Sequence, residues 1–139
     1  MFYVGDFYGK NNVRTAISSD NGASFSFEAG NICGDDAAGG GPNTHVDPDI
    51  IKLPDGTYKL YVMSSKDSGT KIYSFSSTDC RTFTLDSGIR IKPSDFTSPE
   101  VTMLFDPEAV LLPDGSIRIF CGAMVKGSSN MCIVSATSK

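Results

Sequence analysis

Apolar and polar residues alternate along much of this 139-residue chain, in short runs that end at turn signals. In one run Tyr58, Leu60 and Val62 fall on one face and the residues between them on the other. A period of two predicts half-buried antiparallel strands rather than helices. Similar runs recur from residue 2 to residue 136, so the pattern predicts an all-β fold.

Turn residues separate these runs. Asp55-Gly56 and Asp114-Gly115 each stand between apolar runs and predict tight hairpins, because Gly supplies the positive φ that such turns need. Both aspartates are therefore interpreted as turn residues. The Gly-rich segment 31–44 is expected to be a loop that can carry function, and 86–103 a connection.

The segment around the first hairpin occurs twice. Segments 45–62 and 105–120 share Asp-Pro followed by Leu-Pro-Asp-Gly, so Asp47 of the first copy matches Asp106 of the second. Tyr3 likewise matches Tyr61, and segment 1–30 is therefore expected to repeat the second half of a unit. Repetition with a period of about 60 residues indicates an array of similar units.

Each unit then holds four strands, of which the innermost opens at Asp-Pro. Four-stranded antiparallel sheets repeated in this way describe β-propeller blades, of which this chain has about two and a half. The expected division of the single domain 1–139 is a blade remnant at 1–30, a full blade at 44–92 and an incomplete blade at 105–139.

A resemblance to known families follows from two motifs. Residues 18–25 match Ser-x-Asp-x-Gly-x-Thr-Phe, the Asp-box or BNR repeat of sialidase-like propellers, and 77–83 are a degenerate copy with Cys80 in place of Gly. The repeated Asp-Pro and Leu-Pro-Asp-Gly pattern also resembles blade openings of arabinanase/β-xylosidase-type glycoside hydrolases. The resemblance implies a carbohydrate-related propeller, with the boxes on the outer rim.

The same resemblance suggests catalytic residues. In the arabinanase type a blade-opening Asp is the base, a second Asp tunes the acid, and a Glu from another blade is the acid. Asp47 and Asp106 match the Asp positions, Glu108 is a candidate acid, and Glu100 is a candidate acid or substrate ligand.

The strand pattern adds two candidate substrate-binding residues, His45 and Asp49. They share one parity with Asp47, while Asp106 and Glu108 share the matching parity of the second copy. Because inner strands line a propeller's channel, these acids should converge. Two or three carboxylates around a sugar ring are what glycosidic cleavage needs.

Other interpretations remain open. An Asp before Pro often bonds its own backbone in a turn, and a lone His at a polar loop edge is more often solvated than a ligand. The arginines match no sialidase triad, and a closed hydrolase needs at least five blades. The alternatives are a lectin-like sugar-binding module and a structural propeller fragment without ligand.

Composition narrows the expected partners. The net charge of −4 and the dispersed basic residues argue against nucleic-acid binding. No apolar run in the sequence approaches the length needed to cross a bilayer. We expect no secretory signal in this sequence. The four cysteines lack zinc-site spacing, so no metal or cofactor is expected. Free thiols are favoured over a disulfide, although Cys121 and Cys132 fall on neighbouring predicted strands.

Strand counting also predicts assembly. The first unit lacks its inner strand and the third lacks its outer one, which leaves edges and apolar faces without neighbours. A homo-oligomer, most simply a two-fold dimer, is therefore expected.

Overall fold

The computed structural model covers the whole chain and describes residues 1–6, 11–28, 32–33, 45–65 and 69–138. Within these ranges every regular element is a β-strand, apart from a short 3-10 helix at Pro93–Asp95. The predicted all-β class is thus confirmed. No helix in the described ranges is long and apolar enough to cross a bilayer.

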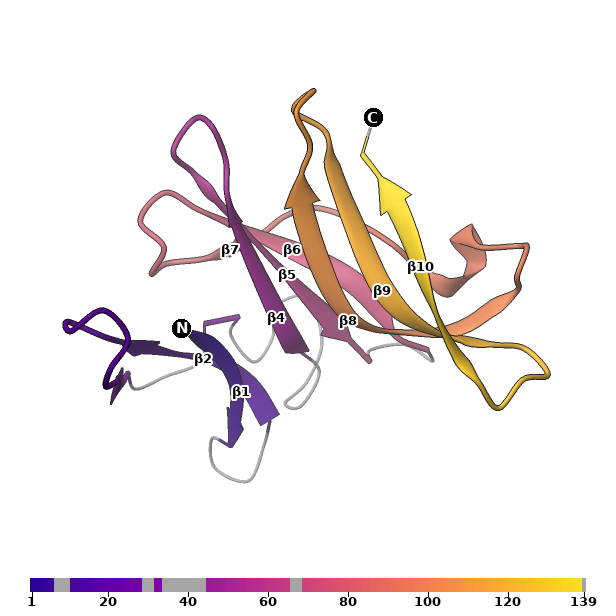
Figure 1. Cartoon of the computed structure of the whole chain (residues 1–139), viewed down its shortest axis with the longest axis horizontal. Helices are drawn as coiled ribbons and strands as arrows, with labels where there is room; N and C mark the ends of the chain where they lie inside the picture. The colour runs from indigo at the N-terminus through magenta and orange to yellow at the C-terminus, as the bar shows by residue number, and fades with distance from the viewer. Residues whose placement is uncertain (7–10, 29–31, 34–44, 66–68, 139) are drawn as a thin grey trace.

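Three antiparallel sheets follow one another along the chain (Figure 1). Sheet 1 has the order β1 (Phe2–Asp6), β2 (Asn11–Ile17), β3 (Ser26–Phe27). Sheet 2 has the order β4 (His45–Lys52), β5 (Tyr58–Ser64), β6 (Lys71–Ser77), β7 (Thr84–Leu85). Sheet 3 consists of β8 (Val101–Leu111), β9 (Ile117–Val125) and β10 (Met131–Thr137). The allocation of three, four and three strands is the one that the repeat predicts.

The two Asp-Gly hairpins form as their sequence requires. The Asp55 carboxylate accepts the backbone N–H of Thr57 at 2.9 Å, and Asp114 accepts that of Ser116 at 3.0 Å. Gly56 has a φ of 88°, a conformation that an L side chain rarely adopts. Both aspartates are turn residues, as predicted.

Strand pairing corrects the register of the first repeat by one residue. Phe2 pairs with Thr15 as Tyr61 pairs with Ser74, so Phe2 is the counterpart of Tyr61. The expected match of Tyr3 with Tyr61 is wrong, because it would place the Tyr3 side chain on the opposite face of its sheet. The spacing between Asp47 and Asp106 is then also the spacing between Phe2 and Tyr61, so one period holds for both the inner and the second strands.

An apolar core lies on each face of sheet 2. Leu60, Val62 and Phe75 form one core with Val13 of sheet 1. The other core lies between sheets 2 and 3. Sheet 2 contributes Tyr61 and Ile72 to it, and these residues alternate along their strands with those of the first core. Each large side chain buried in this way stabilises the fold by about 1.5 to 3 kcal/mol.

Sheet 3 begins earlier than the sequence pattern indicates. β8 starts at Val101, which pairs with Val125, whereas the strand was expected from Phe105. Leu104, which pairs with Ala123, is completely buried in the core between sheets 2 and 3. The strand was expected to start later because the preceding connection contains two prolines, which are typical of loops. The expected functional loop at 31–44 lies outside the described residues except for its second and third positions.

The two box segments form similar turns. The Asp20 carboxylate accepts the backbone N–H of Ser24 at 2.9 Å and its hydroxyl at 2.6 Å. Hydrogen bonds from Ser18 and Ser24 hold the pKa of Asp20 well below its usual value. In the second turn Asp79 accepts the backbone N–H groups of two following residues at 2.8 Å each, and these bonds lower the pKa of Asp79 to about 2.

Strand β7 is tied down by a polar cluster around Asp86. Its carboxylate receives hydrogen bonds from Lys59 at 2.7 Å and from Ser74 and Ser76 at 2.6 Å each. Burial raises the pKa of Asp86, but these hydrogen bonds outweigh the effect of burial, so the pKa is lowered.

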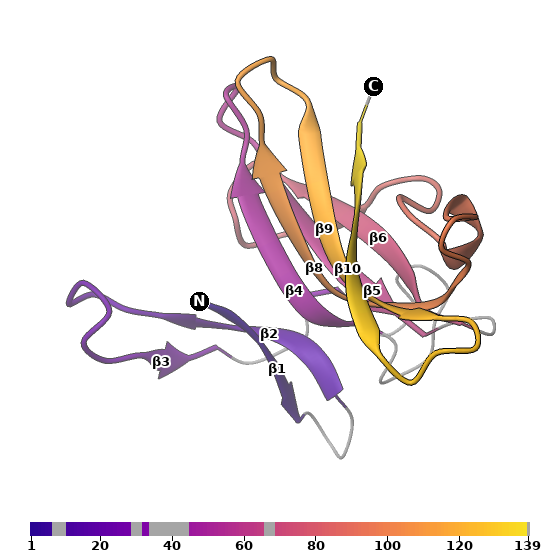
Figure 2. The same cartoon turned by 45° about the vertical axis from the view of Figure 1, so that its right-hand side comes forward.

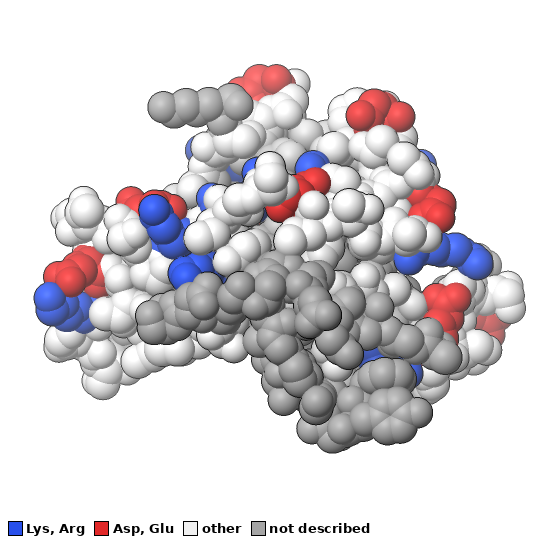
Figure 3. Space-filling model, turned by 180° about the vertical axis from the view of Figure 1, so that it is seen from behind, with Lys and Arg blue, Asp and Glu red and all other residues white. Residues whose placement is uncertain are grey.

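Figure 3 shows a face of the molecule on which acidic and basic side chains are interspersed.

Cys80 occupies the left-handed conformation, with a φ of 60°. We expect Cys80→Gly to raise the free energy of unfolding by about 0.5 to 1 kcal/mol, because relief of the left-handed strain exceeds the entropy cost of Gly. Thermal and urea unfolding measure this change. Cys80→Ala is the control, since it removes the thiol but keeps the strain. An equal gain from Ala would show that the backbone conformation is not the cause.

Candidate functional site

The two Asp-Pro segments form matching β-bulges on the inner strands. In β4 the pairing passes from Val46 with Met63 to Asp49 with Tyr61, which leaves Asp47 and Pro48 bulged. In β8 the same interruption falls between Phe105 and Glu108. We call the segments 46–49 and 105–108 the Asp-Pro bulges. A Pro inside a strand is tolerated at such a bulge because no ladder hydrogen bond is required there.

Both bulges hold their aspartate in a strained conformation. Asp47 has a φ of 53° and Asp106 a φ of 47°. The left-handed region costs an L residue roughly 1 to 2 kcal/mol, and a following proline disfavours any conformation outside the β region. Strained backbone residues cluster at functional sites, and bulges commonly redirect a side chain there.

The bulges meet where β4 and β8 lie side by side (Figures 1 and 2). An open cavity of about 310 Å³ lies between them. Among the described residues its lining is the two acidic Asp-Pro triplets: Asp47, Pro48, Asp49, Asp106, Pro107 and Glu108. Four carboxyl groups from two neighbouring sheets therefore gather around one hollow.

Asp47 and Asp106 form a close pair within this cavity. Burial raises the pKa of Asp47, and the negative charge of Asp106 raises it further. The backbone amide of Asp106 opposes the shift by donating a hydrogen bond to the Asp47 carboxylate. The negative charge of Asp106 thus lies near enough to the Asp47 carboxyl group to raise its pKa, and one member of the pair can tune the other.

Asp49 has a different role from the one predicted. Its carboxylate accepts the backbone N–H of Ala109 at 2.7 Å and so joins strand β4 of sheet 2 to strand β8 of sheet 3. The parity argument that grouped Asp49 with Asp47 fails, because the bulge between them interrupts the alternation. Asp49 lines the cavity but acts as a tie between sheets.

His45 lies in the interior. Its side chain is 2% exposed and packs edge-on against Phe75, with ring centroids 5.8 Å apart. Burial lowers the pKa of His45 to about 4, so the imidazole is neutral at physiological pH. The expectation of a solvated histidine is wrong, and the described structure does not bring His45 to the acidic cavity.

The two glutamates lie in different places. Glu108 is exposed and lines both the acidic cavity and a second hollow of about 370 Å³ on the face of sheet 3. Glu100 forms a surface ion pair with Lys126 at 2.9 Å. It stands six residues before Asp106, roughly 20 Å along an extended strand. The structure therefore groups Glu108, and not Glu100, with the aspartates.

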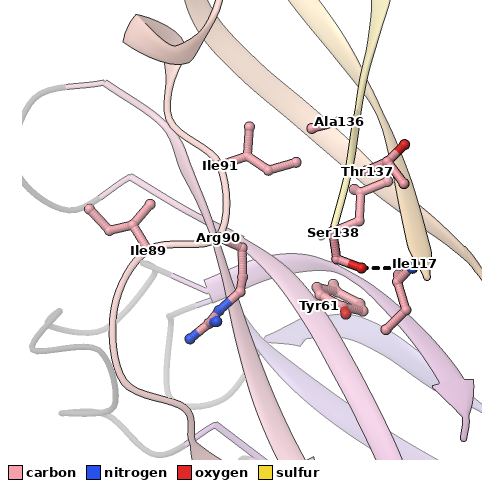
Figure 4. Close-up of a pocket in the computed structure, with 9 residues that line it drawn as sticks. Tyr61, Ile89, Arg90, Ile91, Ile117, Ala136, Thr137 and Ser138 are labelled. Atoms are coloured by element: carbon pink, nitrogen blue, oxygen red, sulfur yellow. Dashed lines mark hydrogen bonds between the residues drawn. The ribbon is translucent and has the colours of Figure 1, made fainter. Parts of the chain in front are cut away.

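A further cavity of about 220 Å³ lies between sheets 2 and 3 (Figure 4). Tyr61 and several isoleucines line it, and the Ser138 hydroxyl accepts the backbone N–H of Ile117 at 2.9 Å. The described residues of this lining include no carboxylate. Its apolar walls suit packing better than acid chemistry.

The cysteines are free thiols, the state that the sequence favours. Burial raises the pKa of Cys33 to about 12 and that of Cys121 to about 11, so neither forms a thiolate near neutral pH. No group of three or more His, Cys, Asp or Glu side chains in the described ranges is arranged to hold a metal ion.

Sequence reasoning missed the bulges themselves. Pro48 and Pro107 were expected near strand starts, but Pro107 is the seventh residue of strand β8 and lies well inside it. The prolines were the available signal, because a Pro well inside a strand indicates a bulge. It also missed the tie from Asp49 to Ala109, which no spacing rule within one strand could reveal.

Comparison with known proteins identifies the fold. No family model matches the sequence, and no curated protein matches it. The endo-arabinase from Bacteroides thetaiotaomicron is 18% identical with a TM-score of 0.77, over 99% of this chain and 51% of that one. The protein BT0996, solved as an RGII complex, is 24% identical with a TM-score of 0.70, over 93% of this chain and 36% of that one.

A plant protein extends the comparison. Fructan 1-exohydrolase IIa from Cichorium intybus is 17% identical with a TM-score of 0.66, over 95% of this chain and 27% of that one. The chain therefore has the fold of β-propeller glycoside hydrolases, in the form of a partial propeller. It spans about half or less of the length of these structures.

The raised pKa of Asp47 can be measured directly. A carboxyl ¹³C NMR titration should show Asp47 ionising at higher pH than a free aspartate, and Asp106→Asn should lower this pKa by removing a neighbouring negative charge. Asp114→Asn is the matched control, because Asp114 lies in an exposed hairpin. An unchanged Asp47 titration in Asp106→Asn would contradict the coupling.

The same shift predicts how stability depends on pH. Because the folded pKa of Asp47 exceeds its unfolded value, its stabilising contribution is complete below about pH 4 and is lost as the pH rises through the folded pKa. Asp47→Asn should therefore unfold at an equal or higher temperature than the unmodified protein at pH 7, and any gain should shrink at pH 3. A clear loss at pH 7 would identify Asp47 as a turn-building residue instead.

Proposed function

We propose that this chain forms part of the catalytic centre of a carbohydrate-cleaving propeller. The observation that carries the proposal is the pair of partly buried Asp47 and exposed Asp106, held by two strained bulges in a cavity whose described lining is the repeated acidic segments. Perturbed carboxylates in a hollow are typical of functional sites. The fold shared with glycoside hydrolases supports the same class of reaction.

The geometry suggests separate roles for the carboxylates. In this proposal Asp47 is the base or nucleophile at the sugar, and Asp106 tunes it through its charge. Glu108 is the third carboxylate of the cavity and the candidate proton donor to the leaving oxygen. A carbohydrate is the proposed ligand, since one similar structure is described as an RGII complex and another as an endo-arabinase.

Three finer assignments accompany this proposal. The turns at 18–25 and 77–83 are proposed to be Asp-boxes of the sialidase-like type, supported by the aspartate bonds within each turn. The blade boundaries 1–30, 44–92 and 105–139 are proposed for one domain, supported by the order of the three sheets. A homo-oligomer, with a dimer favoured, is also proposed, supported by exposed large apolar side chains such as Phe27 and Ile133.

A lectin-like role is the second candidate. The acidic cavity is open, which also suits binding of a sugar without cleavage. The structural alternative without ligand is supported at Asp49, whose carboxylate is engaged by the backbone amide of Ala109 in the next sheet.

Enzyme assays separate these functions. On a panel of chromogenic arabinosides, xylosides and fructosides, with arabinan and fructan as polymers, we expect turnover that Asp47→Asn reduces by about 100-fold or more. Asp55→Asn changes only an exposed hairpin and should leave the rate unchanged. Binding on a glycan array without turnover on any substrate would favour the lectin-like role. Activity that survives Asp47→Asn would contradict the catalytic proposal.

A further inference from the structure

The first box turn, residues 18–25, carries an Asn-Gly sequence at its tip. Asn21 and Gly22 lie between strands β2 and β3, and both residues are exposed. This is the only Asn-Gly sequence in the chain, since the other asparagines precede Asn, Val, Ile, Thr or Met. The second box turn has Cys80-Arg81 at its tip instead. The two box turns therefore differ in the covalent chemistry that is open to them.

An asparagine can be attacked by the backbone nitrogen of the residue that follows it. A bond forms between this nitrogen and the side-chain carbonyl carbon, the bond from that carbon to the side-chain NH2 group breaks, and ammonia leaves with the proton that the backbone nitrogen gives up. Water then opens the five-membered succinimide ring at either carbonyl, which gives aspartate or isoaspartate. Gly22 favours the attack, because it has no side chain to shield its nitrogen and it adopts many backbone conformations.

The folded turn engages the attacking nitrogen in a hydrogen bond. The N–H of Gly22 donates to the Ser18 hydroxyl oxygen at 2.8 Å. The Ser18 hydroxyl in turn donates to the Asp20 carboxylate at 2.6 Å, and the same carboxylate oxygen accepts the backbone N–H of Ser24 at 2.9 Å. Because the nitrogen must lose its proton before it can attack, a bond that holds this proton slows the reaction.

The backbone conformation of the turn also opposes ring closure. Asn21 has a φ of 57° and Gly22 a φ of 88°. A left-handed residue has a ψ of about +47°, at which the following nitrogen points away from Cβ, whereas ring closure needs this nitrogen on the Cβ side. Rotation about the Asn21 Cα–C bond would carry the N–H of Gly22 away from Ser18. The reaction therefore requires the turn to open.

We propose that Asn21 is a site of spontaneous deamidation whose rate is controlled by the hydrogen bond from Gly22 to Ser18. The closed box turn protects the Asn-Gly sequence, and each opening of the turn exposes it to attack. The reaction consumes water and releases ammonia. It goes beyond the proposed function and does not depend on it, because no carboxylate of the acidic cavity takes part.

The products do not fit the closed turn. Isoaspartate continues the chain through its side chain, which lengthens the backbone before Gly22 and displaces its N–H from Ser18. Either product also adds a negative charge beside Asp20, and like charges held close repel one another. Deamidation is thus a one-way step that weakens the hairpin in which β2 pairs with β3.

Tandem mass spectrometry of peptides from the full chain, incubated at mildly alkaline pH, tests the proposal. We expect Ser18→Ala to deamidate at Asn21 about tenfold faster than the unmodified chain, because the variant lacks the hydrogen bond that holds Gly22. The modified peptide gains about 1 Da, or about 3 Da in H2¹⁸O, since water supplies the incoming oxygen. Ser18→Thr keeps a hydroxyl group and should retain the slow rate.

Ser77→Ala is the matched control. It removes the serine of the second box turn, whose hydroxyl accepts the backbone N–H of Cys80 at 2.9 Å, and it should leave the Asn21 rate unchanged. This variant separates loss of the local bond from a general loss of stability, which circular dichroism also monitors. Asn130 is an internal control, because it is exposed but precedes Met131 and should keep its mass.

Comparison with the urea-unfolded chain keeps the proposal testable even if Ser18→Ala does not fold. Deamidation of Asn21 that is slow in the folded chain and fast in urea would support protection by the turn. Equal rates in the folded and unfolded chains, or a folded Ser18→Ala that reacts no faster than the unmodified chain, would overturn it. An Asn21 peptide that keeps its mass even in urea would show that Asn21 is not a deamidation site.

Discussion

The hydrogen bond from the Ala109 amide to the Asp49 carboxylate is the contact on which the arrangement of the site depends. It joins the inner strands of two sheets that share no backbone ladder, immediately beside both Asp-Pro bulges. A partly buried charge-assisted bond of this kind fixes position as well as adding stability. Together with the hydrogen bond from the Leu104 amide to the Thr70 hydroxyl at 2.6 Å and the packed apolar residues, it holds the two sheets, and with them the two strained aspartates, in place.

At the two bulges the backbone adopts an unfavourable conformation that places the Asp47 and Asp106 side chains at the cavity. Two aspartates in left-handed geometry before proline, one of them with a raised pKa, each make the fold less stable than a regular strand would. The surrounding structure tolerates this strain because side-chain hydrogen bonds stabilise the neighbouring hairpins and buried apolar residues stabilise both faces of sheet 2. The molecule therefore concentrates its strain at one place, where the acidic groups meet.

The sequence was sufficient to predict the architecture and only part of the site. Alternation, the Asp-Gly turns and the internal repeat predict the number and order of strands, because each depends on local chemistry. The convergence of Asp47, Asp106 and Glu108 could also be predicted from the repeat. The fates of His45 and Asp49 could not, since the first is decided by packing against Phe75 and the second by a backbone amide from the next sheet. A bulge also defeats any argument based on strict alternation.

The position of sheet 2 between two cores has a consequence for how the molecule fluctuates. Sheets 1 and 3 each pack against it from one side, so its strands have neighbours on both faces while the outer sheets have a described neighbour on one. Strands that are packed on both faces open less readily than strands that are packed on one. Amide hydrogens of β5 and β6 should then be the slowest to exchange with solvent, and the acidic cavity sits beside the boundary between the slow and the fast parts of the chain.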